Sequence, residues 1–355
     1  MTQTFQTAVV GVTGYAGAEL ARLLVHHPRL QGKAPVFVGR VDEKDAARGG
    51  VPLAEIHPHL IDSRGTGDLK QEPFRWETLE ARGVEVLFLA TPHEQSREWV
   101  PEALKRNIKV IDLSGAWRLN VDANRAVYAF QDDGTAEAAA IQAQAVYGMP
   151  ELHREKIATA KLVANPGCYA TSVILPLRPL VEAGVIDLEH GIVSDSKSGI
   201  SGAGKAPTAK THFMYGADNL SAYGVFTHRH TGELLEQIGL ENDQIVFTPH
   251  LLPIPRGILS TIYVRFSEKQ THASILAFYK KFFAGSPLVR LHEKDLPQIQ
   301  NVVRTSYCDI GFQLSADGRR CVIVSCLDNL LKGASSQAVQ NMNLLYGWGE
   351  SEGLE

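Results

Sequence analysis

The segment Asn165-Pro-Gly-Cys-Tyr-Ala-Thr171 places one thiol, Cys168, directly after a Pro-Gly pair and ahead of the apolar run Val173-Ile-Leu175. Pro and Gly end the preceding element. The thiol is therefore expected at the start of a helix, near unpaired backbone N–H groups and the positive end of the helix dipole. This environment favours the thiolate, which is the nucleophilic form. We predict that Cys168 is a catalytic nucleophile, and the competing interpretation is a buried structural thiol.

A nucleophilic cysteine needs a group that moves protons, and the segment Thr227-His-Arg-His-Thr-Gly-Glu233 contains candidates. Two imidazoles, His228 and His230, flank Arg229, and imidazole titrates near neutral pH. Glu233 follows His230 by three residues, so on a helix its carboxylate would orient that ring. We therefore favour His230 over His228 for the proton transfer. A charged helix cap is the alternative interpretation of this segment.

The spacing Gly11-x-x-Gly14-x-x-Gly17 follows an apolar strand and precedes a helical pattern. Such glycines permit a tight turn and a close approach of the backbone to a pyrophosphate at a helix N-terminus. The spacing differs from the usual G-x-G-x-x-G, and a plain strand-to-helix turn is the alternative. Arg40 ends the second strand, where an arginine suits the 2′-phosphate of NADP. We therefore predict a dinucleotide site that prefers NADP to NAD.

Further residues at strand ends or in loops could bind the cofactor or an anion. Thr91-Pro92 and Ser114 end later strands, at the sheet edge where cofactors bind. Arg118 and Arg256 lie in loop-like sequence and could each hold a carboxylate or phosphate, although a structural role is equally expected.

The segment Gly199-Ile-Ser-Gly-Ala-Gly-Lys205-Ala206 nearly matches a P-loop. Ala206 lacks the hydroxyl that would bind Mg²⁺, and no helical pattern follows, which argues against an NTPase. We expect this loop to wrap an anionic substrate with its backbone N–H groups and Lys205.

The pattern of apolar segments predicts two domains. Strands and helices alternate up to residue 113, which indicates an α/β domain with a parallel sheet. Beyond Cys168, strand patterns dominate and predict an α+β domain with a mostly antiparallel sheet. We place the first domain at 1–166 with a helical tail at 327–355, and the second at 167–326. The charged residues Glu350 to Glu355 are expected to fray.

Composition excludes several classes of protein. The 355 residues carry a formal net charge of −4 without a basic stripe, which argues against nucleic-acid binding. No signal peptide or membrane-length apolar run is visible, so we expect a cytoplasmic protein without membrane partners. The other cysteines, Cys308, Cys321 and Cys326, lie in apolar stretches and are expected in the core. Since no CxxC pair exists, we expect no metal site.

Together these residues resemble the N-acetyl-γ-glutamyl-phosphate reductase family, the arginine-biosynthesis members of the semialdehyde dehydrogenase group, over the whole chain. The Cys168 and His228-Arg-His230 segments are the specific matches, since aspartate-semialdehyde dehydrogenases share the plan but differ around both. The other matching stretches are Gly11–Leu20, Ser198–Gly204, Pro249–Pro253 with Arg256-Gly257, Asp328-Asn-Leu330, and Lys332-Gly-Ala334.

The resemblance implies NADPH-dependent reduction of N-acetyl-γ-glutamyl phosphate to N-acetylglutamate 5-semialdehyde and phosphate, through a thioester on Cys168. It also implies a Rossmann-type domain completed by the C-terminal helix, and a homo-oligomer, either dimer or tetramer. The residues expected to bind substrate are Arg118, Asn165, Ser198, Gly199, Lys205, Arg229 and Arg256. The residues expected to bind NADP(H) are Gly11, Thr13, Gly14, Tyr15, Ala16, Gly17, Arg40, Thr91, Pro92, Ser114 and Asn329.

Three alternatives remain open on sequence alone. The substrate could be the aminoadipyl or the aspartyl analogue of the acyl phosphate. The aminoadipyl analogue differs by one methylene, which a pocket discriminates by only about 1–3 kcal/mol. The chain could also be a non-catalytic NADP-binding sensor, although a sensor needs neither the thiol nor the histidine pair.

Overall fold

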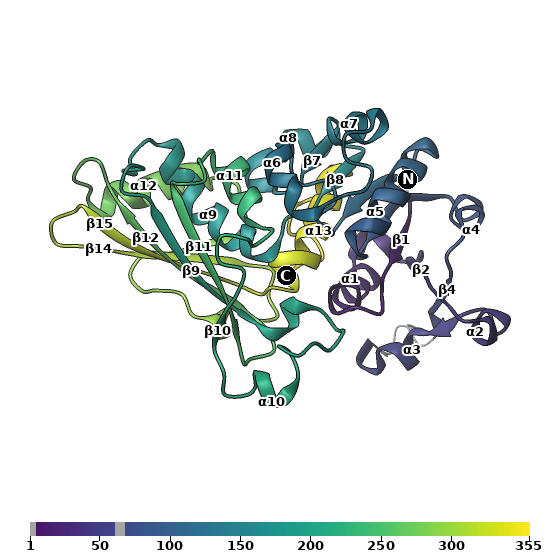
Figure 1. The fold of residues 1–355 in the computed structure, drawn as a ribbon. Helices are drawn as coiled ribbons and strands as arrows, with labels where there is room; N and C mark the ends of the chain where they lie inside the picture. Colours follow the sequence, from purple (N-terminus) through teal and green to yellow (C-terminus); the bar gives the residue numbers. More distant parts are fainter. Residues whose placement is uncertain (1–4, 61–67) are drawn as a thin grey trace. The chain divides into compact units, whose positions relative to one another are not determined.

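The computed structural model describes residues 5–60 and 68–355, and the chain divides into two compact units. The first unit comprises the described part of Met1–Arg118 together with Phe130–Asn165 and Ser335–Glu355. The second unit comprises Leu119–Ala129 and Pro166–Ala334. The chain therefore leaves the first unit twice and returns to it twice, as the colours of Figure 1 allow the reader to follow.

The first unit is built on an eight-stranded sheet in the order β3-β4-β2-β1-β5-β6-β8-β7. Its neighbouring strands run parallel except for β3 and β4, which pair antiparallel. This confirms the expected parallel α/β domain. The strands are β1 (Gln6–Val10), β2 (Val36–Gly39), β3 (Val51–Pro52), β4 (Lys70–Pro73), β5 (Val84–Leu89), β6 (Lys109–Asp112), β7 (Ala145–Tyr147) and β8 (Leu162–Ala164).

Both faces of this sheet are buried, which explains why its strands are continuous apolar runs. Leu87 of β5 packs with Val100 of α5 in one core cluster. The next residue of β5, Phe88, points to the other face and is also fully buried. The helices of the unit are α1 (Tyr15–Val25), α2 (Glu43–Ala47), α3 (Leu53–Ile56), α4 (Trp76–Ala81), α5 (His93–Lys105), α7 (Ala136–Gln142), α8 (Pro150–Ala158) and α13 (Ser336–Leu345).

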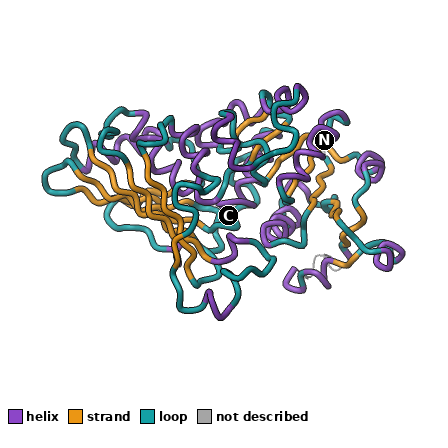
Figure 2. Tube along the Cα trace, in the orientation of Figure 1, coloured by secondary structure: helices purple, strands orange, loops and turns teal. Residues whose placement is uncertain are grey.

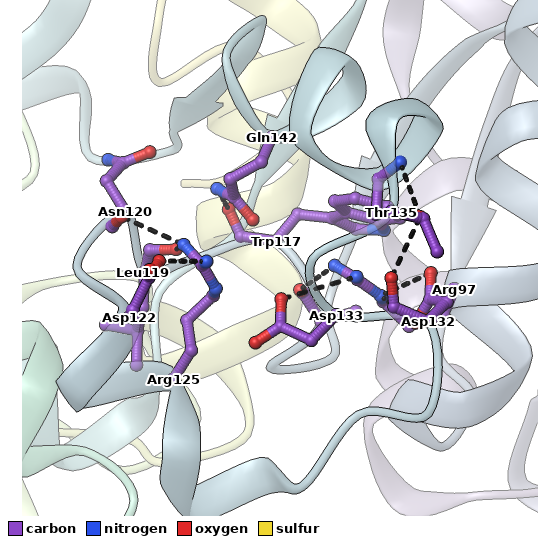
Figure 3. Close-up of polar contacts among 12 residues, drawn as sticks. Arg97, Trp117, Leu119, Asn120, Asp122, Arg125, Asp132, Asp133, Thr135 and Gln142 are labelled. Carbon is purple, nitrogen blue, oxygen red and sulfur yellow. Dashed lines mark hydrogen bonds and ion pairs between the residues drawn. The ribbon is translucent and has the colours of Figure 1, made fainter.

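A buried arginine anchors the segments around β6 in the first unit. The Arg97 guanidinium lies between two aromatic rings, 4.1 Å from the centre of Trp117 and 4.7 Å from that of Phe130. Its Nε donates to both carboxylate oxygens of Asp132, at 2.9 and 3.1 Å (Figure 3). Burying this charge is tolerated because it is paired and lies against ring faces.

The second unit is built on a seven-stranded sheet in the order β10-β11-β9-β12-β15-β14-β13. The pairs β11–β9 and β13–β14 are parallel and the others antiparallel, which confirms the expected mostly antiparallel sheet. Figure 2 shows its strands as the dense group of orange segments. The strands are β9 (Ile192–Gly199), β10 (Ser221–Ala222), β11 (Ile245–Leu252), β12 (Ile258–Arg265), β13 (Val289–His292), β14 (Cys308–Leu314) and β15 (Arg320–Leu327).

Helix α9 lies against this sheet and carries Cys168 as its first residue. It contacts β9, β12 and β15, and α11 and α12 pack beside it (Figure 1). A chain of buried hydroxyls ties it down, because Ser172 lies 2.7 Å from Ser260 of β12, which lies 2.7 Å from Ser196 of β9. The helices of the unit are α6 (Asp122–Arg125), α9 (Cys168–Glu182), α10 (Phe213–Gly216), α11 (Thr231–Ile238) and α12 (His272–Phe282).

The compact units differ from the expected domain boundaries at residues 119–129, 166 and 327–334, which belong to the second unit. The reason for the first segment is Glu236 of α11, whose carboxylate accepts the N–H groups of Asn120 and Val121 at 2.7 and 3.0 Å. Within the same segment, Arg125 donates to the carbonyl of Asn120 at 2.9 Å (Figure 3). Leu327 ends β15, and residues 328–334 turn around the buried carboxylate of Asp328.

The C-terminal residues are anchored, so the expectation that Glu350 to Glu355 fray is wrong. Glu350 pairs with Arg154, Glu352 pairs with Arg29, and Leu354 is buried. The sequence shows only a charged tail because each partner lies roughly 200 to 320 residues earlier. Within residues 5–60 and 68–355, no helix has both the length and the apolar character needed to cross a membrane.

Candidate active site

The structure places Cys168 at the helix start that the Pro-Gly pair predicts. Gly167 is the N-cap of α9, and the N–H of Thr171 closes the first turn on the Gly167 carbonyl at 2.9 Å. The side chain of Cys168 is partly exposed, whereas Tyr169 and Ala170 after it are buried. A thiol at this position is accessible to a reactant and lies in the favourable field of a fifteen-residue helix.

His230 and Glu233 surround the residue that precedes the thiol. The buried Glu233 carboxylate accepts the N–H of Gly167 at 2.9 Å, and its other oxygen lies 3.9 Å from His230 Nε2. The His230 ring packs so closely on Gly167 that a Cβ at that position would lie 2.6 Å from its Cε1. His230 is the N-cap of α11, so Glu233 lies on the same face, as the three-residue spacing predicts. Glycine at 167 thus admits the imidazole to the start of α9.

The neighbours of His228 fix the tautomer and the charge of its ring. Its Nδ1 accepts the N–H of His230 at 3.1 Å, so in the neutral ring the proton is on Nε2. Burial and the Arg229 charge lower the pKa of His228 to about 4. The ring is therefore neutral at neutral pH. This favours His230 over His228 as the group that carries a proton in the reaction.

Two tyrosines that the sequence analysis did not single out line the histidine pair. Tyr169 lies edge-on to both His228 and His230, with ring centres 5.7 and 6.2 Å away, and its hydroxyl donates to the His250 carbonyl at 2.6 Å. Tyr223 lies 5.5 Å from the His228 ring. Burial raises the pKa of Tyr223 to about 12, so this phenol stays protonated. Tyr169 follows Cys168 directly, but the amino-acid sequence does not show in which direction its side chain points.

Arg256 and Asn329 meet at one end of the second unit's sheet. Arg256 Nη1 lies 3.7 Å from a carboxylate oxygen of Asp328, which is fully buried. Asn329 accepts the N–H of Gly257 at 2.8 Å and donates to Ser201 Oγ at 2.9 Å. Asp328 and Asn329 thus hold the loop that carries Arg256.

The near-P-loop segment follows β9 and is not a P-loop. After Gly199 the chain forms the 3-10 turn η5 (Ile200–Ala203), and no long helix follows. A Cβ at Gly199 would lie 2.7 Å from the Arg256 backbone nitrogen, so the loop passes directly over Arg256. Ser198 is buried, whereas Lys205 and Arg229 are exposed. The segment thus brings Ser198, Gly199 and Arg256 together, and it leaves Lys205 on the surface.

The glycine loop of the first unit has the close backbone packing that its sequence predicts. Gly11 has a φ of +91°, and the N–H of Gly14 bonds to its carbonyl at 3.1 Å. A Cβ at Gly17 would lie 2.8 Å from the Val12 Cα, so α1 starts in direct contact with the loop. Gly14 is the N-cap of α1, and Tyr15 and Ala16 form its first turn.

This loop opens onto a pocket of about 650 Å³ at the carboxyl ends of the central strands. Cofactor sites in parallel sheets lie at this edge. Six of the expected cofactor residues line the pocket, and they are Gly11, Thr13, Gly14, Arg40, Thr91 and Pro92. Sequence analysis missed other lining residues, which include Gln71, Phe74, Gln95 and Trp99.

The lining residues fit a dinucleotide. The Thr91 hydroxyl is buried at this pocket and has no hydrogen-bond partner among the described residues, so a ligand atom would satisfy it. Arg40 is exposed at the pocket, whereas the next carboxylate, Asp42, caps α2 by accepting the Asp45 N–H at 2.8 Å. Among the described residues at the end of β2, Arg40 offers a cation to the pocket, and the Asp42 carboxylate caps α2.

Three expected ligand-binding residues serve the framework of the first unit. Arg118 is buried, and it donates to the carbonyls of Asn165 and Leu113 at 2.7 and 2.8 Å. Asn165 is fully buried and accepts from Asn341 at 3.1 Å. Ser114 donates to the buried carboxylate of Asp112 at 2.7 Å. These bonds fix the ends of β6 and β8, and burial raises the pKa of Asp112.

The comparisons with known families also divide the chain into two parts. Residues 6–160 match the family model described as semialdehyde dehydrogenase, NAD binding domain. Residues 168–329 match the model described as semialdehyde dehydrogenase, dimerisation domain. The nucleophile is thus the first residue of the second match, and the glycine loop lies near the start of the first.

Relatives in curated collections align over nearly the whole chain. A protein of Desulforapulum autotrophicum named N-acetyl-gamma-glutamyl-phosphate reductase is 41% identical, over 99% of this chain and 98% of its own length. One of Methanococcus maripaludis with the same name is 39% identical, over 98% and 97%. The chain thus aligns with nearly the full length of these relatives.

Solved structures of aspartate semialdehyde dehydrogenases share the fold. The enzyme II of Vibrio cholerae, in complex with ASA, has a TM-score of 0.70 at 19% identity, covering 97% of this chain and 99% of its own. The Candida albicans enzyme with NADP has a TM-score of 0.68 at 14% identity, covering 98% and 99%. Identities this low establish the fold alone.

Proposed function

Since the chain belongs to the N-acetyl-gamma-glutamyl-phosphate reductase family of semialdehyde dehydrogenases, we propose that it reduces N-acetyl-γ-glutamyl phosphate to N-acetylglutamate 5-semialdehyde and phosphate in arginine biosynthesis. The observation that carries the proposal is the arrangement around Gly167. There, a partly exposed thiol begins a buried helix, and an imidazole and a carboxylate converge on the residue before it.

Cys168 is the nucleophile in the first half of the reaction. Its thiolate attacks the acyl carbon, the S–C bond forms, and the C–O bond to phosphate breaks to leave a thioester. N–H groups at the start of α9 stabilise the oxyanion that develops on the carbonyl oxygen. His230 delivers a proton to the departing phosphate, and Glu233, 3.9 Å from its Nε2, positions the ring for that step. Arg256, held by Asp328, is the candidate cation for the substrate's anionic groups.

In the second half, a reduced nicotinamide cofactor supplies the two electrons as a hydride. Residues Gly11, Gly14 and Thr91 would hold this cofactor at the pocket of the first unit. Once the thioester carbon has been reduced, its bond to sulfur breaks, the aldehyde leaves, and Cys168 returns to the thiolate. The buried Tyr169 beside the histidines limits the access of water to them.

Several finer features belong to the same proposal. Arg40 at the pocket supports NADPH as the preferred cofactor. The match to a dimerisation domain supports a homo-oligomer, a dimer or a tetramer, and the exposed Val193 and Tyr263 on the second sheet would suit such a contact. Dinucleotide binding would belong to the first unit and catalysis to the second, whose bounds differ from the expected domains 1–166 with 327–355 and 167–326 at residues 119–129, 166 and 327–334. A cytoplasmic location remains a prediction from the sequence.

The test is NADPH oxidation, followed by the absorbance of the reduced nicotinamide, with synthetic N-acetylglutamyl phosphate. The wild type should turn it over and prefer it to the aspartyl and aminoadipyl analogues. Cys168→Ala should abolish turnover, and Cys308→Ala, which alters a buried core cysteine, should retain it. Preference for another acyl phosphate would reassign the substrate. Full turnover by Cys168→Ala would refute the thioester mechanism.

A further inference from the structure

Two buried polar side chains approach the cofactor pocket from outside the loops that form it. Both come from the segment between β2 and α4, whose strands β3 and β4 extend one edge of the first sheet. They are His57, at the end of α3, and Gln71, in β4. His57 is 7% exposed and Gln71 is 3% exposed. A polar group buried this deeply needs a specific partner. Each of the two side chains forms a hydrogen bond with a backbone carbonyl of a cofactor loop.

His57 bonds the glycine loop. Its Nε2 lies 2.7 Å from the carbonyl oxygen of Val12, and a carbonyl can only accept, so Nε2 carries the proton. The peptide group between Val12 and Thr13 is planar and trans, so its N–H points opposite to its C=O. His57 thereby fixes the direction of the Thr13 N–H. Thr13 lines the pocket, and Gly11 before it has a φ of +91°. His57 therefore supports the glycine loop by a hydrogen bond from outside the loop.

Gln71 forms a similar hydrogen bond with the backbone at the end of β2. Its Nε2 donates to the Arg40 carbonyl at 3.0 Å, which fixes the peptide that continues to Val41. Arg40, Val41 and Gln71 all line the pocket. The approach depends on Gly39, because a Cβ there would lie 3.0 Å from the Gln71 amide nitrogen. The amide thus holds the backbone of the residue whose guanidinium faces a 2′-phosphate under the proposed function.

We propose that His57 and Gln71 are positioning residues for the dinucleotide, acting through the Val12 and Arg40 carbonyls without touching the reacting atoms. The proposal rests on the proposed function, since it requires that the pocket bind a nicotinamide dinucleotide. His57 sets the direction of a phosphate-loop N–H and so affects NADPH and NADH alike. Gln71 sets the position of Arg40 and so affects NADPH more than NADH. The β3–β4 edge therefore contributes to both affinity and cofactor choice.

The experiment measures NADPH and NADH dissociation constants by fluorescence titration of the full chain. His57→Leu, which lacks the donor, should raise both constants by about tenfold, the effect of one buried hydrogen bond. His57→Gln retains an N–H at similar reach and should restore most of that loss. Gln71→Met removes the amide at similar volume and should raise the NADPH constant by about tenfold and the NADH constant less. His59→Gln, at an exposed neighbouring ring, is the matched control.

Activity and stability separate positioning from general damage. At saturating cofactor, kcat and the KM for the acyl phosphate should remain those of the wild type, while the KM for the cofactor rises. Unchanged cofactor constants in His57→Leu and Gln71→Met would overturn the proposal. So would a parallel rise in both KM values, or a His57→Gln variant as impaired as His57→Leu. If the wild type itself bound neither dinucleotide, the proposed function would fail instead.

Discussion

Gly167→Ala should separate the position of His230 from the presence of the thiol. Gly167 has φ −75° and ψ 148°, values that alanine adopts without strain, so the added methyl acts only through space. That methyl carbon would lie 2.6 Å from His230 Cε1 and 2.7 Å from its Cδ2. Ordinary contact begins near 3.4 Å. The imidazole must therefore retreat by about 1 Å, because a methyl carbon and a ring cannot interpenetrate.

The retreat is restricted by the ring's other neighbours. His228 lies 4.7 Å from His230 between ring centres, and Tyr169 lies on another side. A misplacement of about 1 Å in a catalytic group can reduce the rate roughly 100-fold. This corresponds to about 2.7 kcal/mol of transition-state stabilisation. We expect kcat to fall by this order, whereas the affinity for the dinucleotide should not change, since Gly167 does not line the cofactor pocket.

The assay is acyl-phosphate-dependent NADPH oxidation, combined with the rate of Cys168 alkylation by iodoacetamide. Alkylation needs only the thiolate, so it should continue in Gly167→Ala while turnover is lost. Gly349→Ala is the matched control, because no atom lies within 4 Å of the added methyl and the backbone has no positive φ. A Gly167→Ala enzyme with kcat close to that of the wild type would refute the role assigned to the His230 position.

Three further predictions follow from single contacts. Burial and the Arg229 charge hold the folded pKa of His228 at about 4, against 6.5 when unfolded. As the pH falls, the unfolded state therefore binds the proton first. The free energy of unfolding should fall by up to about 3 kcal/mol between pH 6.5 and 4. Urea titrations should show a smaller loss over this pH range in His228→Gln than in the wild type. Glu236→Ala removes the acceptor of the Asn120 and Val121 N–H groups and should lower the free energy of unfolding by about 1–3 kcal/mol, measured in the same way. Arg40→Ala should weaken NADPH binding roughly 10- to 100-fold and leave NADH binding unchanged, and equal losses for both cofactors in a titration would contradict the role of Arg40.

Local patterns predicted the parts of the site that depend on local structure. The Pro-Gly pair predicts the start of α9 because those residues end the preceding element, and the structure confirms it. The spacing of His230 and Glu233 predicts a shared helix face, because three residues nearly complete one turn. Continuous apolar runs predict the buried parallel strands, because both faces of a parallel sheet are covered.

Contacts between distant segments could not be predicted in this way. Arg118 has the sequence of a loop cation, but its donors bond carbonyls that follow β6 and β8. Only the folded chain shows whether a guanidinium faces a ligand or the framework. The packing of His57 on Val12 joins residues 45 apart, and the sequence between them gives no indication of it. The charged tail is held by partners on α8 and beside α1 for the same reason.

The return of the last 21 residues to the first unit affects how the protein can be made. Helix α13 is buried on nearly every side and contacts α1, α8 and β6. Domains usually fold in the order in which they are synthesised. Here the half that contains the N-terminal glycine loop lacks one of its helices until translation ends. On the ribosome, the thiol-bearing half can therefore finish folding first, and a prematurely terminated chain would expose the surface that α13 covers.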